Sequence, residues 1–109
     1  MLLKRRGFGM KVLIVCAGGM SSAIVLKAIQ LEAEKQGLPL TLKAIGAHEL
    51  ENELPDYDMA LVAPQIRHRF VSLSDIGKKL NKKVQLIPST GYTPMGAPSV
   101  IEMIKKELS

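Results

Sequence analysis

A chain of 109 residues is long enough for one domain with a modest core, and 47% hydrophobic with 23% charged residues is ordinary for a globular protein. The hydrophobic runs are too short to span a bilayer, so we expect no direct membrane insertion. The net charge of +5 is accompanied by only two tyrosines and two phenylalanines, which argues against a base-stacking surface and against nucleic acid as a partner. The single cysteine excludes an internal disulfide framework and favours a cytoplasmic location.

The first nine residues differ in character from the rest of the chain. They contain the basic cluster Lys4, Arg5 and Arg6 but no apolar stretch of signal-peptide length, and a second methionine follows at Met10. We therefore expect residues 1–9 to be a flexible N-terminal extension, with Met10 as an alternative start, and residues 10–109 to form the domain.

The first half of the chain alternates between strand and helix periodicity, which is typical of an α/β fold. A strand is expected over residues 11–15, followed by a glycine-rich loop and a helix that ends at Gly37. Ile24, Ala28 and Leu31 form one apolar stripe of this helix, with Val25 and Ile29 beside it. Residues 40–46 alternate between apolar and polar and predict an edge strand.

The second half continues the same alternation. Residues 47–55 are acidic and irregular, with at most one helical turn, and residues 59–63 form a continuous apolar strand expected beside the first one. A helix through residues 66–80, a short strand over 84–87 and an irregular Pro- and Gly-rich loop over 88–96 follow. Pro98 opens a last helix that turns Ile101, Ile104 and Leu108 inward.

Four strands separated by helices predict an open parallel sheet with helices on both faces, right-handed crossovers and the strand order 2-1-3-4. Ligands of such sheets bind outside the carboxyl ends of the strands, where the strand order reverses. The loop after Cys16 is expected there, beside the strand that ends at Ala63. Pro64-Gln65 and Pro88-Ser89 are expected to approach from the neighbouring strand ends.

The strongest candidate site is the loop that follows the first strand, with the sequence Cys16-Ala17-Gly18-Gly19-Met20-Ser21-Ser22-Ala23. Glycines allow the backbone to approach an anion closely, and the first turn of a helix supplies unpaired amide donors and a positive dipole end. The same donors favour a thiolate. We therefore predict Cys16 as a nucleophile and the backbone amides of residues 17–23 as its phosphate cradle, with the Ser21 and Ser22 hydroxyls as further donors.

Other interpretations of Cys16 make different demands on the chain. It could be a buried cysteine that acts as a small apolar residue, or a redox switch, although the chain has no second thiol to resolve it. A phosphatase loop needs an arginine six positions after the cysteine to clamp the phosphoryl oxygens, and Ser22 occupies that position. The arginine-free loop favours a carrier that holds a phosphoryl group. A small phosphatase or arsenate-reductase-like enzyme, and a non-catalytic anion-binding module, are the alternatives.

The residues around these strand ends resemble a known family. Two segments are similar to the enzyme IIB component of the lactose, cellobiose and diacetylchitobiose class of the bacterial phosphoenolpyruvate-dependent sugar phosphotransferase system. They are Ile14-Val15-Cys16-Ala17-Gly18-Gly19-Met20-Ser21-Ser22 after the first strand and Ala63-Pro64-Gln65-Ile66 after the third. The resemblance extends over residues 10–109.

The resemblance implies a two-step relay without a metal or a cofactor. Cys16 would accept a phosphoryl group from a phosphohistidine of enzyme IIA. It would then donate it to a disaccharide or β-glucoside bound by the membrane enzyme IIC. The protein would therefore be cytoplasmic and peripherally associated with a membrane permease.

One position departs from the family pattern, because His68 stands where several relatives have a tyrosine. His68 lies between Arg67 and Arg69. It is either a solvent-facing helix residue or part of a positive patch that attracts an acidic enzyme IIA or steadies the phosphoryl charge. Met20 is either a packing residue or part of a docking surface. With Pro64 and Gln65, His68 forms a candidate second loop of the site.

Overall fold

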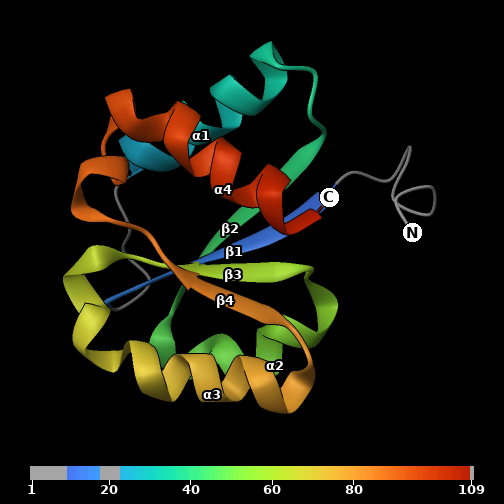
Figure 1. Cartoon of the computed structure of the whole chain (residues 1–109), viewed down its shortest axis with the longest axis vertical. Coiled ribbons are helices and arrows are strands. Elements are labelled where there is room, and N and C mark those ends of the chain that lie inside the picture. Colours follow the sequence, from blue (N-terminus) through green and yellow to red (C-terminus); the bar gives the residue numbers. More distant parts are fainter. Residues whose placement is uncertain (1–9, 18–22, 109) are drawn as a thin grey trace.

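A parallel four-stranded sheet in the order β2-β1-β3-β4 forms the centre of the protein (Figure 1). The computed structural model describes residues 10–17 and 23–108. The strands are β1 (Met10–Cys16), β2 (Leu40–Gly46), β3 (Met59–Val62) and β4 (Lys83–Leu86). All three neighbouring pairs are parallel, so the predicted strand order is confirmed and β2 is an edge strand. The expected N-terminal extension and the central part of the Cys16 loop, Gly18 to Ser22, lie outside the described residues.

Helices cover both faces of the sheet (Figure 1). On one side lie α1 (Ala23–Lys35) and α4 (Ala97–Leu108), and on the other lie α2 (Leu50–Glu53) and α3 (Phe70–Leu80). Because successive side chains of a strand point to opposite faces, Val12 and Ile14 belong to one buried cluster and Leu13 and Val15 to the other. The central strand therefore connects two apolar cores.

The buried face of α1 differs from the predicted stripe. Val25, Ile29 and Ala33 are buried, whereas Ile24 is 68% exposed and Leu31 is 54% exposed. The helix contains two apolar stripes side by side, and contacts with other elements of the fold decide which stripe is buried. Gln30 is half-buried, and its side-chain amide donates a hydrogen bond to the Leu40 carbonyl oxygen at 2.8 Å.

The ends of two helices depend on left-handed residues. Gly37 has a φ of +70°, as its expected position after α1 requires, and the Leu38 amide donates to the Ala33 carbonyl at 2.8 Å. Asn81 ends α3 with a φ of +60°, a conformation that asparagine tolerates better than most residues. Both turns lead directly into the next strand of the sheet.

Three segments differ in their helical structure from what the sequence predicts. The acidic stretch forms 3₁₀ turns at Ala47–Glu49 and Leu54–Asp56 around α2, because Leu50 and Leu54 are both fully buried. The helix expected over residues 66–80 is divided into a 3₁₀ segment, Pro64–Arg69, and α3. The loop expected to be irregular contains 3₁₀ turns at Ser89–Gly91 and Pro94–Gly96.

The last helix agrees with the prediction. Ile101 and Ile104 of α4 are fully buried, while the placement of the Leu108 side chain lies outside the description. At the ends of α4 and α1, the Lys105 ammonium donates to the Gln36 side-chain oxygen at 3.0 Å. None of the helices in the described ranges has the length and hydropathy of a bilayer-spanning segment.

Candidate functional site

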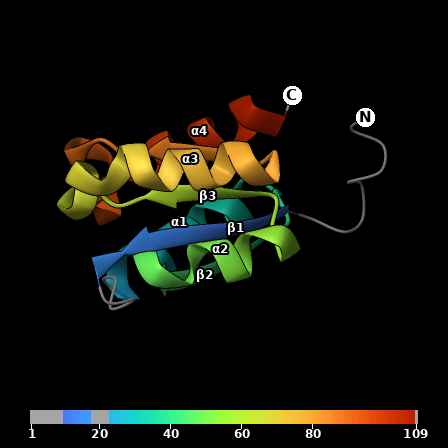
Figure 2. The ribbon, with the colours of Figure 1, turned by 90° about the horizontal axis from the view of Figure 1, so that it is seen from below.

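The site is built at the carboxyl edge of the sheet, where the strands end side by side. Cys16 is the last residue of β1 and pairs in register with Gly46, the last residue of β2. On its other side, Val15 pairs with Val62 of β3, and the Ala63 amide donates to the Val15 carbonyl at 2.8 Å. Figure 2 shows β1 and β3 running in the same direction, so that both end on this side of the molecule. The predicted juxtaposition of Cys16 and Ala63 is confirmed.

Cys16 points to the face covered by α1 and α4 and is only 5% exposed. Its thiol donates a hydrogen bond to the Ile45 carbonyl oxygen, with an Sγ-to-oxygen distance of 3.6 Å. This contact belongs to the protonated sulfur, because a carbonyl oxygen accepts a proton and repels an anion. A thiolate at this position would therefore need donors from another part of the site.

The expected donors are the backbone amides of residues 17–23. Of these, Ala17 and Ala23 are described, and both are exposed. Gly18, Gly19, Met20, Ser21 and Ser22 lie outside the described residues, so the amide cradle remains a prediction. Ala23 is the first residue of α1, so the positive end of that helix dipole lies at the edge where Cys16 ends its strand.

A small hollow opens between the segments that follow β3 and β4. The described residues lining it are Pro64, Gln65, Arg67, Ser89 and Tyr92, and its volume is about 170 Å³. Pro64, Gln65 and Ser89 thus lie together at neighbouring strand ends, while the expected approach of Pro64-Gln65 and Pro88-Ser89 to the Cys16 loop stays a prediction. The volume falls below the roughly 300–1,000 Å³ of ordinary ligand pockets, so the hollow suits a side chain or a small anion better than a disaccharide.

The hollow singles out Arg67 and not His68. His68 is exposed and is not among the described residues that line the hollow. The 3₁₀ segment Pro64–Arg69 is kinked at Ile66, whose φ of −118° and ψ of 30° are not helical, so the position of Arg67 does not follow from helical spacing. In the sequence, Arg67 is one of a basic triplet with His68 and Arg69, and no spacing signal distinguishes it, because the kink at Ile66 interrupts the helical period.

The segment after β4 holds Ser89 and Tyr92 in place by close backbone packing. A Cβ atom on Gly96 would lie 2.6 Å from the Gly91 carbonyl oxygen and 2.7 Å from the Thr90 carbonyl oxygen. The Thr93 side-chain oxygen accepts a hydrogen bond from the Gly96 amide at 3.0 Å. The two 3₁₀ turns of this segment therefore fold against each other, and Tyr92, which lies between them in the chain, is buried in the core shared with α1 and α4.

Side chains on the β2 side of the edge are polar. The Glu49 carboxylate accepts a hydrogen bond from the Gly46 amide at 3.1 Å and lies 3.9 Å from the His48 Nε2 atom. Among the described residues, no three His, Cys, Asp or Glu side chains are grouped so that they could hold a metal ion.

Comparison with protein families places this arrangement among known domains. Residues 11–103 match the family model described as "PTS system, Lactose/Cellobiose specific IIB subunit". The chain is 30% identical over 73 residues to the "PTS system lactose-specific EIICB component" of Lactococcus lactis subsp. lactis, covering 67% of this chain and 13% of that protein. It is 24% identical over 100 residues to the component of the same name from Staphylococcus epidermidis, covering 90% of this chain and 17% of that protein. The chain thus spans less than a fifth of these relatives.

Solved structures show the same fold. The lactose-specific IIB component domain from Streptococcus pneumoniae superimposes with a TM-score of 0.73 at 21% identity, covering 87% of this chain and 96% of that one. The cellobiose-specific phosphotransferase IIB component protein from Borrelia burgdorferi gives a TM-score of 0.71 at 28% identity and covers 85% of each chain.

Proposed function

Because the chain belongs to the lactose/cellobiose-specific IIB subunit family of the sugar phosphotransferase system, we propose that it is a phosphocysteine carrier with Cys16 as the phosphorylated residue. The observation that supports this assignment is the position of the single cysteine. Cys16 ends β1 at the carboxyl edge, between the ends of β2 and β3 and at the edge where α1 begins. An anion at this place would lie near the positive end of a helix dipole.

The first proposed step is transfer from enzyme IIA to sulfur. Cys16 first releases to solvent the proton that it donates to the Ile45 carbonyl oxygen, and the thiolate then attacks the phosphorus of a phosphohistidine. The Sγ–P bond forms as the P–N bond breaks, the electron pair of that bond returns to the imidazole, and the imidazole takes up a proton from solvent. The backbone amides of residues 17–23 would hold the phosphoryl oxygens during the transfer.

The second proposed step passes the phosphoryl group to a disaccharide or β-glucoside. A sugar hydroxyl attacks the phosphorus, the Sγ–P bond breaks and its electron pair returns to sulfur, while the hydroxyl proton passes to solvent. The relatives are named EIICB components, which supports a membrane enzyme IIC as the protein that presents the sugar. We accordingly propose a cytoplasmic protein peripherally associated with that permease.

The lack of an arginine in the loop favours storage of the phosphoryl group over hydrolysis. Ser22 stands where a cysteine phosphatase needs a guanidinium to neutralise the equatorial oxygens of the transition state. Without it, attack by water gains little stabilisation. The phosphoryl group can therefore remain on sulfur until an oriented acceptor arrives.

The experiment that tests this function is phosphorylation of the purified chain. Incubation with phosphoenolpyruvate, the general phosphotransferase proteins and a lactose-class enzyme IIA should add one phosphoryl group, detected by intact mass spectrometry. The Cys16-containing peptide should gain the mass, and phosphorylation should protect Cys16 from thiol alkylation. Cys16→Ser should remove the signal.

Two controls separate the carrier from its alternatives. Omitting enzyme IIA should leave the chain unmodified, because the carrier takes its phosphoryl group from phosphohistidine. Hydrolysis of an aryl phosphate by the isolated chain, at a rate that depends on Cys16, would instead indicate a small phosphatase. A wild-type chain that gains no mass with any lactose- or cellobiose-class enzyme IIA would contradict the carrier role.

A further inference from the structure

Two hydrogen bonds at the end of β2 meet in one peptide unit, which joins Ile45 to Gly46. Its carbonyl oxygen accepts the Cys16 thiol, with an Sγ-to-oxygen distance of 3.6 Å, and its N–H group donates to the Glu49 carboxylate at 3.1 Å. Because a peptide bond is planar and conjugated, its N–H and C=O groups are rigidly joined and polarise together. The Glu49 carboxylate is therefore coupled to the Cys16 sulfur through a single peptide.

The carboxylate has two effects on this peptide, and both favour the protonated thiol. Its hydrogen bond to the N–H group holds the plane of the peptide, so that the carbonyl oxygen keeps its place beside the thiol. The same bond leaves more negative charge on that oxygen, which makes it a better acceptor for the S–H group and a worse neighbour for a thiolate. The positive end of the α1 dipole, which favours a thiolate, is thus opposed from the β2 side.

We propose that Glu49 is a positioning residue that keeps Cys16 protonated in the resting chain. Its role in loading rests on the proposed function of Cys16. Loading begins when the sulfur leaves the Ile45 carbonyl, releases its proton to solvent and turns to the amide donors proposed for the loop. Between loadings the protonated thiol is a poor nucleophile, so it is protected from alkylation and oxidation.

Other ionisable groups near this peptide have less influence on the sulfur. The His48 Nε2 atom lies 3.9 Å from the Glu49 carboxylate, but the His48 side chain is 79% exposed and solvent screens its charge. Lys43 of β2 pairs with Glu53 at 3.2 Å. On the face of the sheet that buries the thiol, the described core contains one other ionisable side chain, Tyr92, and a phenol is uncharged at neutral pH.

Alkylation of the thiol tests this role of Glu49 without any partner protein. The rate of reaction with iodoacetamide is measured against pH, and the midpoint of the profile reports the ionisation of Cys16, the one cysteine of the sequence. Glu49→Gln keeps an oxygen that can accept from the Gly46 amide but removes the charge. Its midpoint should lie about half a pH unit below that of wild type, which corresponds to about threefold more thiolate below both midpoints.

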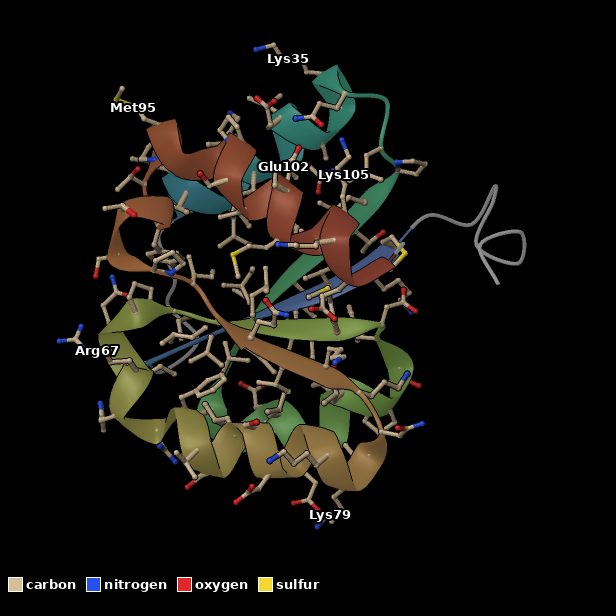
Figure 3. The ribbon with its side chains drawn as sticks, viewed as in Figure 1. Lys35, Arg67, Lys79, Met95, Glu102 and Lys105 are labelled. Carbon is tan, nitrogen blue, oxygen red and sulfur yellow. The ribbon has the colours of Figure 1, made fainter. Side chains whose placement is uncertain are left out.

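Glu51→Gln is the matched control for the loss of charge. It removes a carboxylate from the same acidic segment, but the Glu51 carboxylate pairs with Lys79 of α3 at 2.6 Å. Figure 3 shows Lys79 pointing away from the sheet, so this carboxylate is directed to α3 and not to the end of β2. The midpoint for Glu51→Gln should equal that of wild type. An equal fall in both variants would mean that overall charge sets the midpoint, and it would overturn the role of Glu49.

A purely structural role of Glu49 leads to a different result. The bond from the Gly46 amide to Glu49 also closes the 3₁₀ turn Ala47–Glu49, as a helix cap does. Glu49→Ala loses the bond and the charge, so it should lower both the midpoint of thermal unfolding and the pH midpoint of alkylation. Glu49→Gln should restore the thermal midpoint only. Restoration of both midpoints would show that Glu49 is a cap alone.

The Gly46 amide gives an independent readout by nuclear magnetic resonance. Its resonance should move with the same pH midpoint as the alkylation, because the peptide loses its S–H donor when the thiol ionises. Cys16→Ser should abolish this movement, and a Gly46 resonance that ignores thiol ionisation in wild type would overturn the coupling. Neither measurement uses enzyme IIA. A chain that accepts no phosphoryl group would therefore contradict the proposed function alone.

Discussion

Gly96 is the residue on which the wall of the hollow depends most directly. A Cβ atom at this position would lie 2.6 Å from the Gly91 carbonyl oxygen and 2.7 Å from the Gly91 Cα atom, which are backbone atoms that cannot rotate away. Gly96→Ala should therefore lower the free energy of unfolding by about 1–3 kcal/mol, the usual cost of inserting a carbon into a packed site. Urea titration followed by circular dichroism measures this change.

Gly91 provides the control for this prediction. A Cβ atom on Gly91 would meet the Ile87 Cγ2 atom at 3.4 Å, which is close to an ordinary contact. Gly91→Ala should leave the free energy of unfolding within about 0.5 kcal/mol of wild type. Equal destabilisation by both substitutions would contradict the tight backbone approach at Gly96.

At the residue scale, the sequence could place the strand ends but not every side chain that lines the hollow beside them. Cys16, Pro64 and Gln65 were placed correctly at the carboxyl edge, because a strand end followed by a turn signal is readable from the sequence. Arg67, which lines the hollow, was not distinguished from His68, because the sequence did not show that the segment is kinked at Ile66 and that the helix begins only at Phe70.

The element whose orientation was predicted wrongly is α1, and this difference leads to a testable contrast. Val25 is 4% exposed in the core beneath α4, whereas Ile24 is 68% exposed. Val25→Ala should lower the free energy of unfolding by about 2 kcal/mol, since it removes two buried methyl groups and leaves a cavity. Ile24→Ala should stay within about 0.5 kcal/mol of wild type, as surface substitutions usually do.

Chemical denaturation distinguishes the two faces of α1. The urea midpoint should fall for Val25→Ala and remain unchanged for Ile24→Ala, with the same dependence on urea concentration in both. Loss of stability for Ile24→Ala as large as that for Val25→Ala would mean that the helix buries the stripe expected from the sequence.

The rotation of α1 could not be predicted because the deciding contacts are tertiary. Counting apolar positions gives two stripes of similar hydrophobicity, and neither has an advantage within the isolated helix. The hydrogen bond from Gln30 to the Leu40 carbonyl and the packing of Ala33 in the core shared with α4 select one of them. Both contacts involve elements that follow α1 in the chain.

At the scale of the whole molecule, the topology was predictable because each change in the spacing of apolar residues marks a new strand or helix. The continuous apolar run at Met59–Val62 indicated a strand buried on both faces, and the alternation over Leu40–Gly46 indicated an edge strand. With right-handed crossovers, these two properties leave few possible strand orders. The 3₁₀ turns escaped prediction because single turns have no repeating period.

The expected division between residues 1–9 and the domain leads to a prediction about the whole fold. In the part of the chain that the structure describes, the two cores begin at Met10, and the Met10 amide donates to the Pro39 carbonyl at 3.0 Å, a bond that an N-terminal ammonium can also make. The family match begins at residue 11. A chain that starts at Met10 should therefore keep the midpoint of thermal unfolding and the Cys16 phosphorylation of the full chain.

A slightly longer deletion provides the contrast that makes this prediction sharp. Removing residues 1–12 takes away the buried side chains of Met10 and Val12 and the pairing of Met10, Lys11 and Val12 with β2. Loss of a buried methionine alone costs about 2–5 kcal/mol, a large part of the 5–15 kcal/mol by which a domain is stable. This variant should be largely unfolded by circular dichroism. A lower midpoint for the chain that starts at Met10 would instead mean that residues 1–9 contribute to the fold.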